Sequence, residues 1–113
     1  MTRATALFSL IYPGDEKAKS VTLKNGRKLG CQLFSDTIYT VGTYRYGSLY
    51  EWYFLVPTVN GSRITEVIAV DINGNPDSSL QKEWEAYAEG IIEKLSDSMK
   101  KRLAAVSQQE PSP

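Results

Sequence analysis

The sequence contains no histidine and only one cysteine, Cys31. Without an imidazole there is no histidine base to activate a serine or cysteine nucleophile, and a common ligand of transition metals is missing. A single cysteine cannot form an internal disulfide, which favours a reducing compartment such as the cytoplasm. We therefore predict a cytoplasmic, non-enzymatic protein with no catalytic residues, no metal site and no cofactor.

The sequence also lacks a long apolar run, a phosphate-binding loop and a strong excess of charge of one sign. No stretch approaches the about 20 apolar residues of a membrane-spanning helix, so we expect no membrane partner. The segment "GTYRYG" (42–47) has two glycines, but no helix is expected directly after it. Thirteen basic residues balance 13 acidic ones. A small basic surplus in 1–70 and a small acidic one in 71–113 are typical of a solvated surface.

The apolar content is sufficient for a folded core. Of the 113 residues, 42% are hydrophobic and 11% are aromatic. A chain of this length buries roughly two thirds of its unfolded surface on folding, so it needs neither a disulfide nor a metal for stability. We predict a single α+β domain over 1–107, followed by a disordered tail over 108–113.

Alternating apolar residues and turn signals predict strands as far as Asn75. "ALFSLIY" (6–12) is apolar on both faces, which predicts a central strand, and the polar segment 13–19 is expected to connect it to the next strand. Asn25-Gly26 predicts a type I′ hairpin turn. The positions expected to share the inner face of this hairpin are Val21, Leu23, Leu29, Cys31 and Leu33.

After "NGNPDSS" (73–79) the apolar period changes from two to about 3.6 residues, which predicts one long helix. Asp77, Ser78 and Ser79 are candidate N-caps. The apolar stripe of this helix consists of Leu80, Trp84, Tyr87, Ile91, Leu95, Met99 and Leu103. The predicted fold class is α+β: an antiparallel, curled sheet of about five strands, built from β-hairpins, with one long C-terminal α-helix packed on one face.

The segment 39–56, "YTVGTYRYGSLYEWYFLV", is the most aromatic part of the chain, and Gly47-Ser48 predicts a hairpin turn at its centre. Paired residues share a face of the sheet, which predicts core positions at Tyr39, Val41, Tyr50, Trp52, Phe54 and Val56. The opposite face carries the charge of Glu51 and should be accessible. Its contact residues for a protein, a planar ligand or a base are predicted to be Tyr44, Arg45, Tyr46, Glu51 and Tyr53.

Two registers are open for the hairpin at Asn60-Gly61. A two-residue turn pairs Phe54 with Val67, whereas a bulged three-residue loop pairs it with Ile68. The apolar pattern of the last strand favours the bulged register, which places Glu66 on the core face. A carboxylate there must lie at an edge, pair with a base or line a cavity. The corresponding ligand pocket, between helix and sheet, would be lined by Tyr39, Trp52, Glu66 and Trp84.

The segment "DINGNPD" (71–77) alternates oxygen-bearing side chains, as a calcium-binding loop does. Pro76 stands where such a loop needs a glycine, and Lys82 stands where it needs a bidentate carboxylate. We therefore interpret the segment as an Asx-rich turn followed by a helix cap.

The predicted helix is longer than the sheet. From Leu80 to Val106 it would span about 40 Å, whereas strands of eight to ten residues span roughly 27–34 Å. The overhanging residues Leu95, Met99 and Leu103 would need a partner. Either the end frays, or the sheet curls to meet it, or a homodimer or target protein covers it.

These patterns favour a small non-catalytic interaction protein, an inhibitor or an adaptor. It would bind a protein partner through the aromatic sheet face and the overhanging helix, and form a homodimer. A single-stranded nucleic-acid binder is the first alternative, although the balanced charge disfavours it. Its phosphate contacts would come from Lys24, Arg27, Lys28, Arg45 and Arg63. A small-ligand-binding domain that uses the pocket named above is the second alternative.

Overall fold

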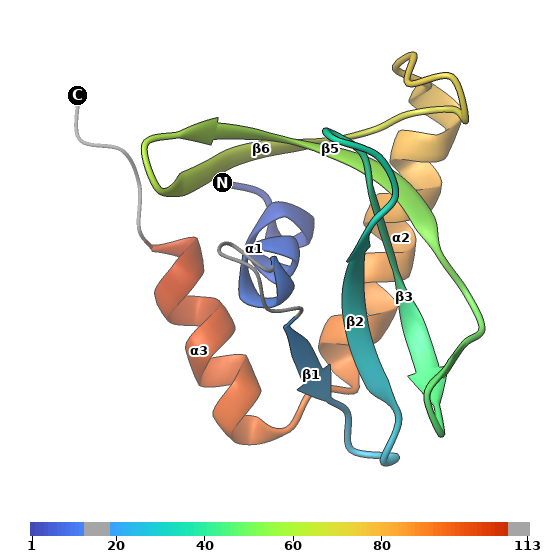
Figure 1. The fold of residues 1–113 in the computed structure, drawn as a ribbon. Helices are drawn as coiled ribbons and strands as arrows, with labels where there is room; N and C mark the ends of the chain where they lie inside the picture. Colours follow the sequence, from blue (N-terminus) through green and yellow to red (C-terminus); the bar gives the residue numbers. More distant parts are fainter. Residues whose placement is uncertain (13–18, 109–113) are drawn as a thin grey trace.

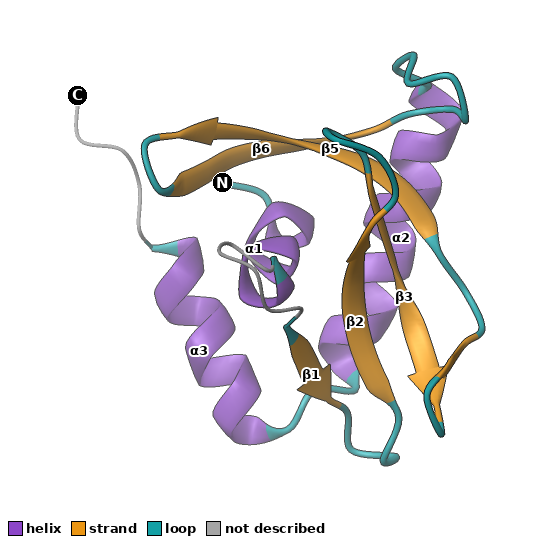
Figure 2. Ribbon diagram, viewed as in Figure 1, coloured by secondary structure: helices purple, strands orange, loops and turns teal. Residues whose placement is uncertain are grey.

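The computed structural model describes residues 1–12 and 19–108. The elements along the chain are α1 (Arg3–Ile11), β1 (Ser20–Thr22), β2 (Lys28–Leu33), β3 (Tyr39–Arg45), β4 (Ser48–Leu49), β5 (Tyr53–Asn60), β6 (Arg63–Ala69), α2 (Ser78–Glu93) and α3 (Asp97–Ser107). All strand pairs are antiparallel, in the order β1-β2-β3-β5-β6, and β4 pairs with β3. The prediction of an α+β fold with a curled antiparallel sheet is confirmed (Figure 2).

The sheet curls around α1, with α2 and α3 on either side of this helix (Figure 1). Helix α1 contacts both other helices as well as β1, β2 and β6. Because it is enclosed on several sides, its side chains Ala6, Leu7, Phe8 and Ile11 are fully buried. The core therefore lies on the concave side of the sheet, and no helix within 1–12 and 19–108 covers the convex side (Figure 1).

The prediction of a strand over 6–12 is wrong, since this segment forms most of α1. The hydroxyl of Thr2 caps the helix by accepting a hydrogen bond from the N–H of Thr5 at 3.1 Å. A short run that is apolar all round suits a buried helix and a buried strand equally well, because neither has a solvated face to reveal its period. The connection predicted over 13–19 lies outside the described residues, apart from Lys19.

The hairpin predicted at Asn25-Gly26 is confirmed, but its predicted type I′ turn is wrong, because the loop has three residues and Asn25 does not have positive φ. The N–H of Leu23 donates to the carbonyl of Arg27 at 2.8 Å, so that 24–26 form the loop. Val21 then lies opposite Leu29 on the core face. Of the predicted inner positions, Val21, Leu23, Leu29 and Cys31 are buried, whereas Leu33 is exposed at the end of β2.

The next hairpin turns one residue earlier than predicted. Arg45 lies opposite Ser48, so the turn residues are Tyr46 and Gly47. Their φ angles are 55° and 84°. A type I′ turn needs positive φ at both central residues, and its twist matches that of the flanking strands.

A bulge after β4 reverses the faces of β5. The carbonyl of Thr43 accepts a hydrogen bond from the N–H of Tyr50 at 2.8 Å, and Val41 lies opposite Tyr53. The two residues Glu51 and Trp52 therefore stand opposite the single residue Gly42. An extra residue in one strand moves every following side chain to the other face.

This reversal corrects the predicted faces of the aromatic segment. Leu55 is fully buried, whereas Trp52 is 51% exposed. Tyr50, which precedes the bulge, is exposed as well. Phe54 lies on the convex face with Trp52. The predictions of core positions at Tyr50, Trp52, Phe54 and Val56 are wrong and that at Val41 is confirmed, whereas Tyr39 is partly buried against the core.

The β5–β6 hairpin adopts neither of the two registers considered from the sequence. Asn60 lies opposite Arg63, and a register shift between Thr58 and Val59 then places Thr58 opposite Glu66. Glu66 is exposed on the convex face. Its predicted place on the core face is wrong, because that prediction assumed Phe54 to point inward.

The predicted long helix is two helices. The N–H of Leu95 donates to the carbonyl of Ile92 at 3.2 Å, which tightens and ends α2. The hydroxyl of Ser96 then caps α3 by accepting from the N–H of Met99 at 3.3 Å. Helix α3 folds back onto α1, so the predicted overhang does not exist. Of the three candidate caps of α2, Asp77 is the one used, because its side chain accepts from the N–H of Leu80 at 3.0 Å.

Candidate functional site

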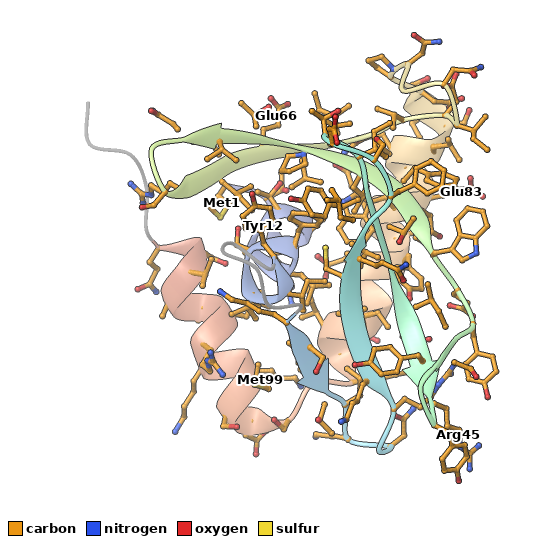
Figure 3. The ribbon with its side chains drawn as sticks, viewed as in Figure 1. Met1, Tyr12, Arg45, Glu66, Glu83 and Met99 are labelled. Atoms are coloured by element: carbon orange, nitrogen blue, oxygen red, sulfur yellow. The ribbon has the colours of Figure 1, made fainter. Side chains whose placement is uncertain are left out.

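The three tyrosines predicted to form one contact surface point to different places. Tyr46 is 89% exposed at the β3–β4 turn, where the guanidinium of Arg45 lies 5.0 Å from the centre of its ring. Figure 3 shows Arg45 at the far end of this hairpin. Tyr44 is half-buried on the convex face, with its ring over Gly30.

Tyr53 points to the opposite side, into the space between sheet and α2. Its ring centre lies 4.7 Å from that of Tyr87 and 5.8 Å from that of Trp84. Burial raises the pKa of Tyr53, and the nearby carboxylates Glu83 and Glu51 raise it further. Tyr53 is therefore part of the packing between the sheet and α2, away from Tyr44 and Tyr46.

The four residues of the predicted ligand pocket are not brought together either. Tyr39 packs edge-on against Tyr12, with ring centres 5.4 Å apart, and Trp84 is fully buried. Trp52 and Glu66 are exposed on the convex face. Figure 3 shows Glu66 and Tyr12 on opposite sides of the β5–β6 hairpin.

The apolar residues predicted to meet a partner on the helix end are used within the chain. Leu95 and Leu103 are buried, and Met99 packs against the core beside them. Figure 3 places Met99 on α3, on the side of the molecule away from Arg45. Helix α1 covers this part of the stripe, so these residues do not present a surface.

A different group of aromatic side chains forms a continuous cluster on the convex face. We call Phe34, Trp52 and Phe54 the aromatic cluster. The ring centre of Phe54 lies 5.0 Å from that of Phe34 and 4.6 Å from that of Trp52. The outer two side chains are each about half exposed, at 52% and 51%.

The backbone around the aromatic cluster fixes where each ring lies. Phe34 begins a tight turn after β2, in which the N–H groups of Phe34 and Ser35 both donate to the carbonyl of Ile38. The bulge turns Trp52 outward, beside Phe54. The sequence carries one sign of this arrangement: Gly42 within a predicted strand is typical of a bulge or of a close approach by another backbone.

The surroundings of the aromatic cluster carry little charge. The register places Thr40, Val56, Thr58, Glu66 and Ile68 on the convex face around and beyond Phe54. Among these five positions, Glu66 alone is charged. Two of the predicted phosphate-binding cations, Lys28 and Arg45, belong to the other end of the β2–β3 pair.

The segment 71–77 forms the turn expected from its sequence. The carboxylate of Asp71 accepts hydrogen bonds from the N–H groups of Asn73 and Asn75, at 2.8 and 3.0 Å. Within 1–12 and 19–108, no three or more acidic or cysteine side chains gather in a way that could hold a metal ion. In the same part of the chain, no helix has the length and apolar character needed to cross a membrane.

No protein-family model, curated protein or solved structure matches this chain.

Proposed function

We propose that this protein is a non-catalytic binding protein that docks a protein partner on its convex sheet face, with the aromatic cluster at the centre of contact. The observation that carries the proposal is the exposure of Phe34 and Trp52 at a place where the backbone holds them against Phe54. Large rings that stay in water in the folded monomer retain apolar area that a partner can bury.

The aromatic cluster is prepared for binding before a partner arrives. Rings in mutual contact have fewer rotamers to lose on association, which lowers the entropic cost. Tryptophan is among the residues that contribute most at protein interfaces, often about 2 kcal/mol or more when truncated. The strands on either side are held by ladder hydrogen bonds, so we expect the partner to meet a surface that changes little on binding.

The charge around the aromatic cluster favours a protein over a nucleic acid. A single-strand binder combines stacking aromatics with a basic groove that follows the phosphates. Here the charged convex neighbour is the carboxylate Glu66. A partner with an apolar patch and basic residues at its rim suits this surface.

The test compares one variant of the cluster with one matched control. Phe34→Ser/Trp52→Ser removes both exposed rings, and Val59→Ser removes an exposed apolar side chain from the distant end of β5. After chemical crosslinking in extract of the host, the wild type and Val59→Ser should retain the same partner, and the double variant should lose it. Equal retention by all three proteins would contradict the proposal.

Two further measurements address the other predicted partners. Quenching of Trp52 fluorescence by a thymidine oligonucleotide at low salt, absent from Trp52→Phe, would show that the face binds bases and would contradict a protein-specific role. Light scattering of the purified protein tests the predicted homodimer. A dimer that Phe34→Ser/Trp52→Ser converts to monomer would identify a second copy of the chain as the partner on this face.

A further inference from the structure

A small cavity lies on the concave side of the sheet, between α2, the β1–β2 loop and the bulge, away from the aromatic cluster. Its volume is about 200 Å³, below the roughly 300–1,000 Å³ of pockets that hold drug-sized ligands. The lining residues that matter for binding are Arg27, Thr43, Glu51, Tyr87, Gly90 and Lys94. Any ligand held there must be small.

Two hydroxyl groups of this cavity are buried without a partner. Thr43 is only 2% exposed. Neither its Oγ1 nor the phenolic oxygen of Tyr87 has a hydrogen-bond partner within 1–12 and 19–108. Both groups line the same cavity, and the Thr43 hydroxyl is close enough for a hydrogen-bonding interaction that lowers the pKa of Tyr87 against the larger effect of burial. They do not meet in hydrogen-bonding geometry, so each keeps the capacity to bind a third group.

Helix α2 keeps the cavity open with small residues. A Cβ placed on Gly90 would have no atom within 4 Å, and Ala86 lies one turn earlier on the same lining. A glycine inside a helix destabilises it relative to alanine. At this position the missing side chain leaves room beside Tyr87.

The charged groups of the cavity differ in sign. The guanidinium of Arg27 lies 5.3 Å from the centre of the Tyr50 ring, which holds it in place at the lining. Glu51 raises the pKa of the Tyr87 phenol and Arg27 lowers it, so both charges act on the same hydroxyl. Lys94 adds a second cation just past the end of α2.

The phenol itself remains a donor. Burial, the largest effect, raises the pKa of Tyr87 to about 12. Near neutral pH the hydroxyl therefore stays protonated and can donate to an anionic oxygen. The cavity thus offers two hydroxyl donors with cations on one side and a carboxylate on the other.

We propose that this cavity binds a small amino-carboxylate zwitterion of the amino-acid class. Its carboxylate oxygens accept hydrogen bonds from Thr43 Oγ1 and the Tyr87 hydroxyl and pair with the Arg27 guanidinium. Its ammonium group pairs with Glu51. A simple anion would have no group to pair with Glu51, and a simple cation would leave both hydroxyl donors unused. The zwitterion pairs with Thr43, Tyr87, Arg27 and Glu51 together. The site is separate from the proposed protein-docking face and does not depend on it.

Backbone amide shifts in a ¹⁵N-labelled sample provide the test, with L-alanine, acetate and methylammonium as probes at matched ionic strength. L-Alanine should give saturable shifts at Thr43, Glu51 and Gly90. Acetate should bind about tenfold more weakly, because it makes no pair with Glu51, and methylammonium should give no saturable shift. Absence of saturation by L-alanine, or acetate binding as tightly as L-alanine, would overturn the proposal.

Variants separate a built site from incidental binding. Tyr87→Phe and Thr43→Val each remove one hydroxyl with little change of shape, and each should weaken L-alanine binding about tenfold. Gly90→Leu fills the cavity with a good helix former, so it should remain folded and lose binding altogether. Val59→Ser is the distant control and should bind as the wild type does. Unchanged affinity in Gly90→Leu would refute the cavity as the site, whatever the other two variants show.

Discussion

The α-carbon of Gly42 lies directly against the backbone of Glu51, the first residue of the bulge that follows β4. A Cβ on Gly42 would collide with the carbonyl oxygen of Glu51 and lie 3.1 Å from the α-carbon of Trp52. This contact makes the bulge possible, and the bulge in turn directs Trp52 outward and Leu55 inward. The aromatic cluster and the concave cavity therefore both depend on a position where only glycine fits.

We predict that Gly42→Ala strongly destabilises the protein. The obstructing atoms belong to the backbone and cannot move aside as a flexible side chain can, so the free energy of unfolding should fall by about 3 kcal/mol, the upper end of the usual cost of overpacking. Urea denaturation followed by circular dichroism measures this loss. A change below about 1 kcal/mol would show that the bulge is absent or shifted in solution.

Gly90→Ala replaces a second glycine, and we expect it to stabilise the protein, whereas Gly42→Ala destabilises it. The position is helical and has open space where the Cβ would lie. We expect the free energy of unfolding to rise by about 0.5–1 kcal/mol, because alanine loses less backbone freedom on folding than glycine does. The same urea experiment measures it, and a loss of stability would mean that the space beside Gly90 is occupied.

The two tryptophans should respond very differently to truncation. Trp84 is fully buried between sheet and helices, so Trp84→Ala should cost about 3–5 kcal/mol. Trp52 lies half in water, and Trp52→Ala should cost about 1 kcal/mol or less. Thermal unfolding of the two variants distinguishes these values. Comparable losses would place Trp52 in the core after all.

Separation of the two C-terminal helices depends on the cap at Ser96. Ser96→Ala removes the hydroxyl that accepts from Met99, so the free energy of unfolding should fall by about 1 kcal/mol. Ser79→Ala, in the first turn of α2, removes an exposed serine hydroxyl and should change it by less than about 0.5 kcal/mol. A variant at Ser96 as stable as the wild type would indicate that α2 continues through this position.

Stability should decline at alkaline pH. Burial raises the pKa of Cys31 from 9.0 to about 12. The folded protein then keeps this proton at a pH where the unfolded chain has lost it, so the unfolded state binds fewer protons and stability falls as pH rises. The contribution is fully present below about pH 9 and is lost progressively toward about pH 12. Cys31→Val, which cannot ionise, should show a smaller decline in urea titrations across this range.

Local patterns were sufficient for several features of this protein. Alternation and Asn-Gly turns predict the antiparallel meander, and the side chain of Asp77 marks the start of α2. The prediction that Cys31 faces inward as a small buried side chain is also confirmed. These features succeed because each depends on neighbours a few residues away, which the sequence displays directly.

Three features were decided only by the tertiary structure. The segment 6–12 is helical because the sheet and two helices enclose it, and an apolar surface on every side carries no period to read. The helix break at Leu95 and Ser96 brings α3 back onto α1. The close contact between Gly42 and Glu51 accommodates one extra residue before β5. Because of this bulge, Phe54 and Trp52 lie at the surface, on the opposite face from the one predicted. Each outcome depends on contacts between distant segments, and no local pattern contains that information.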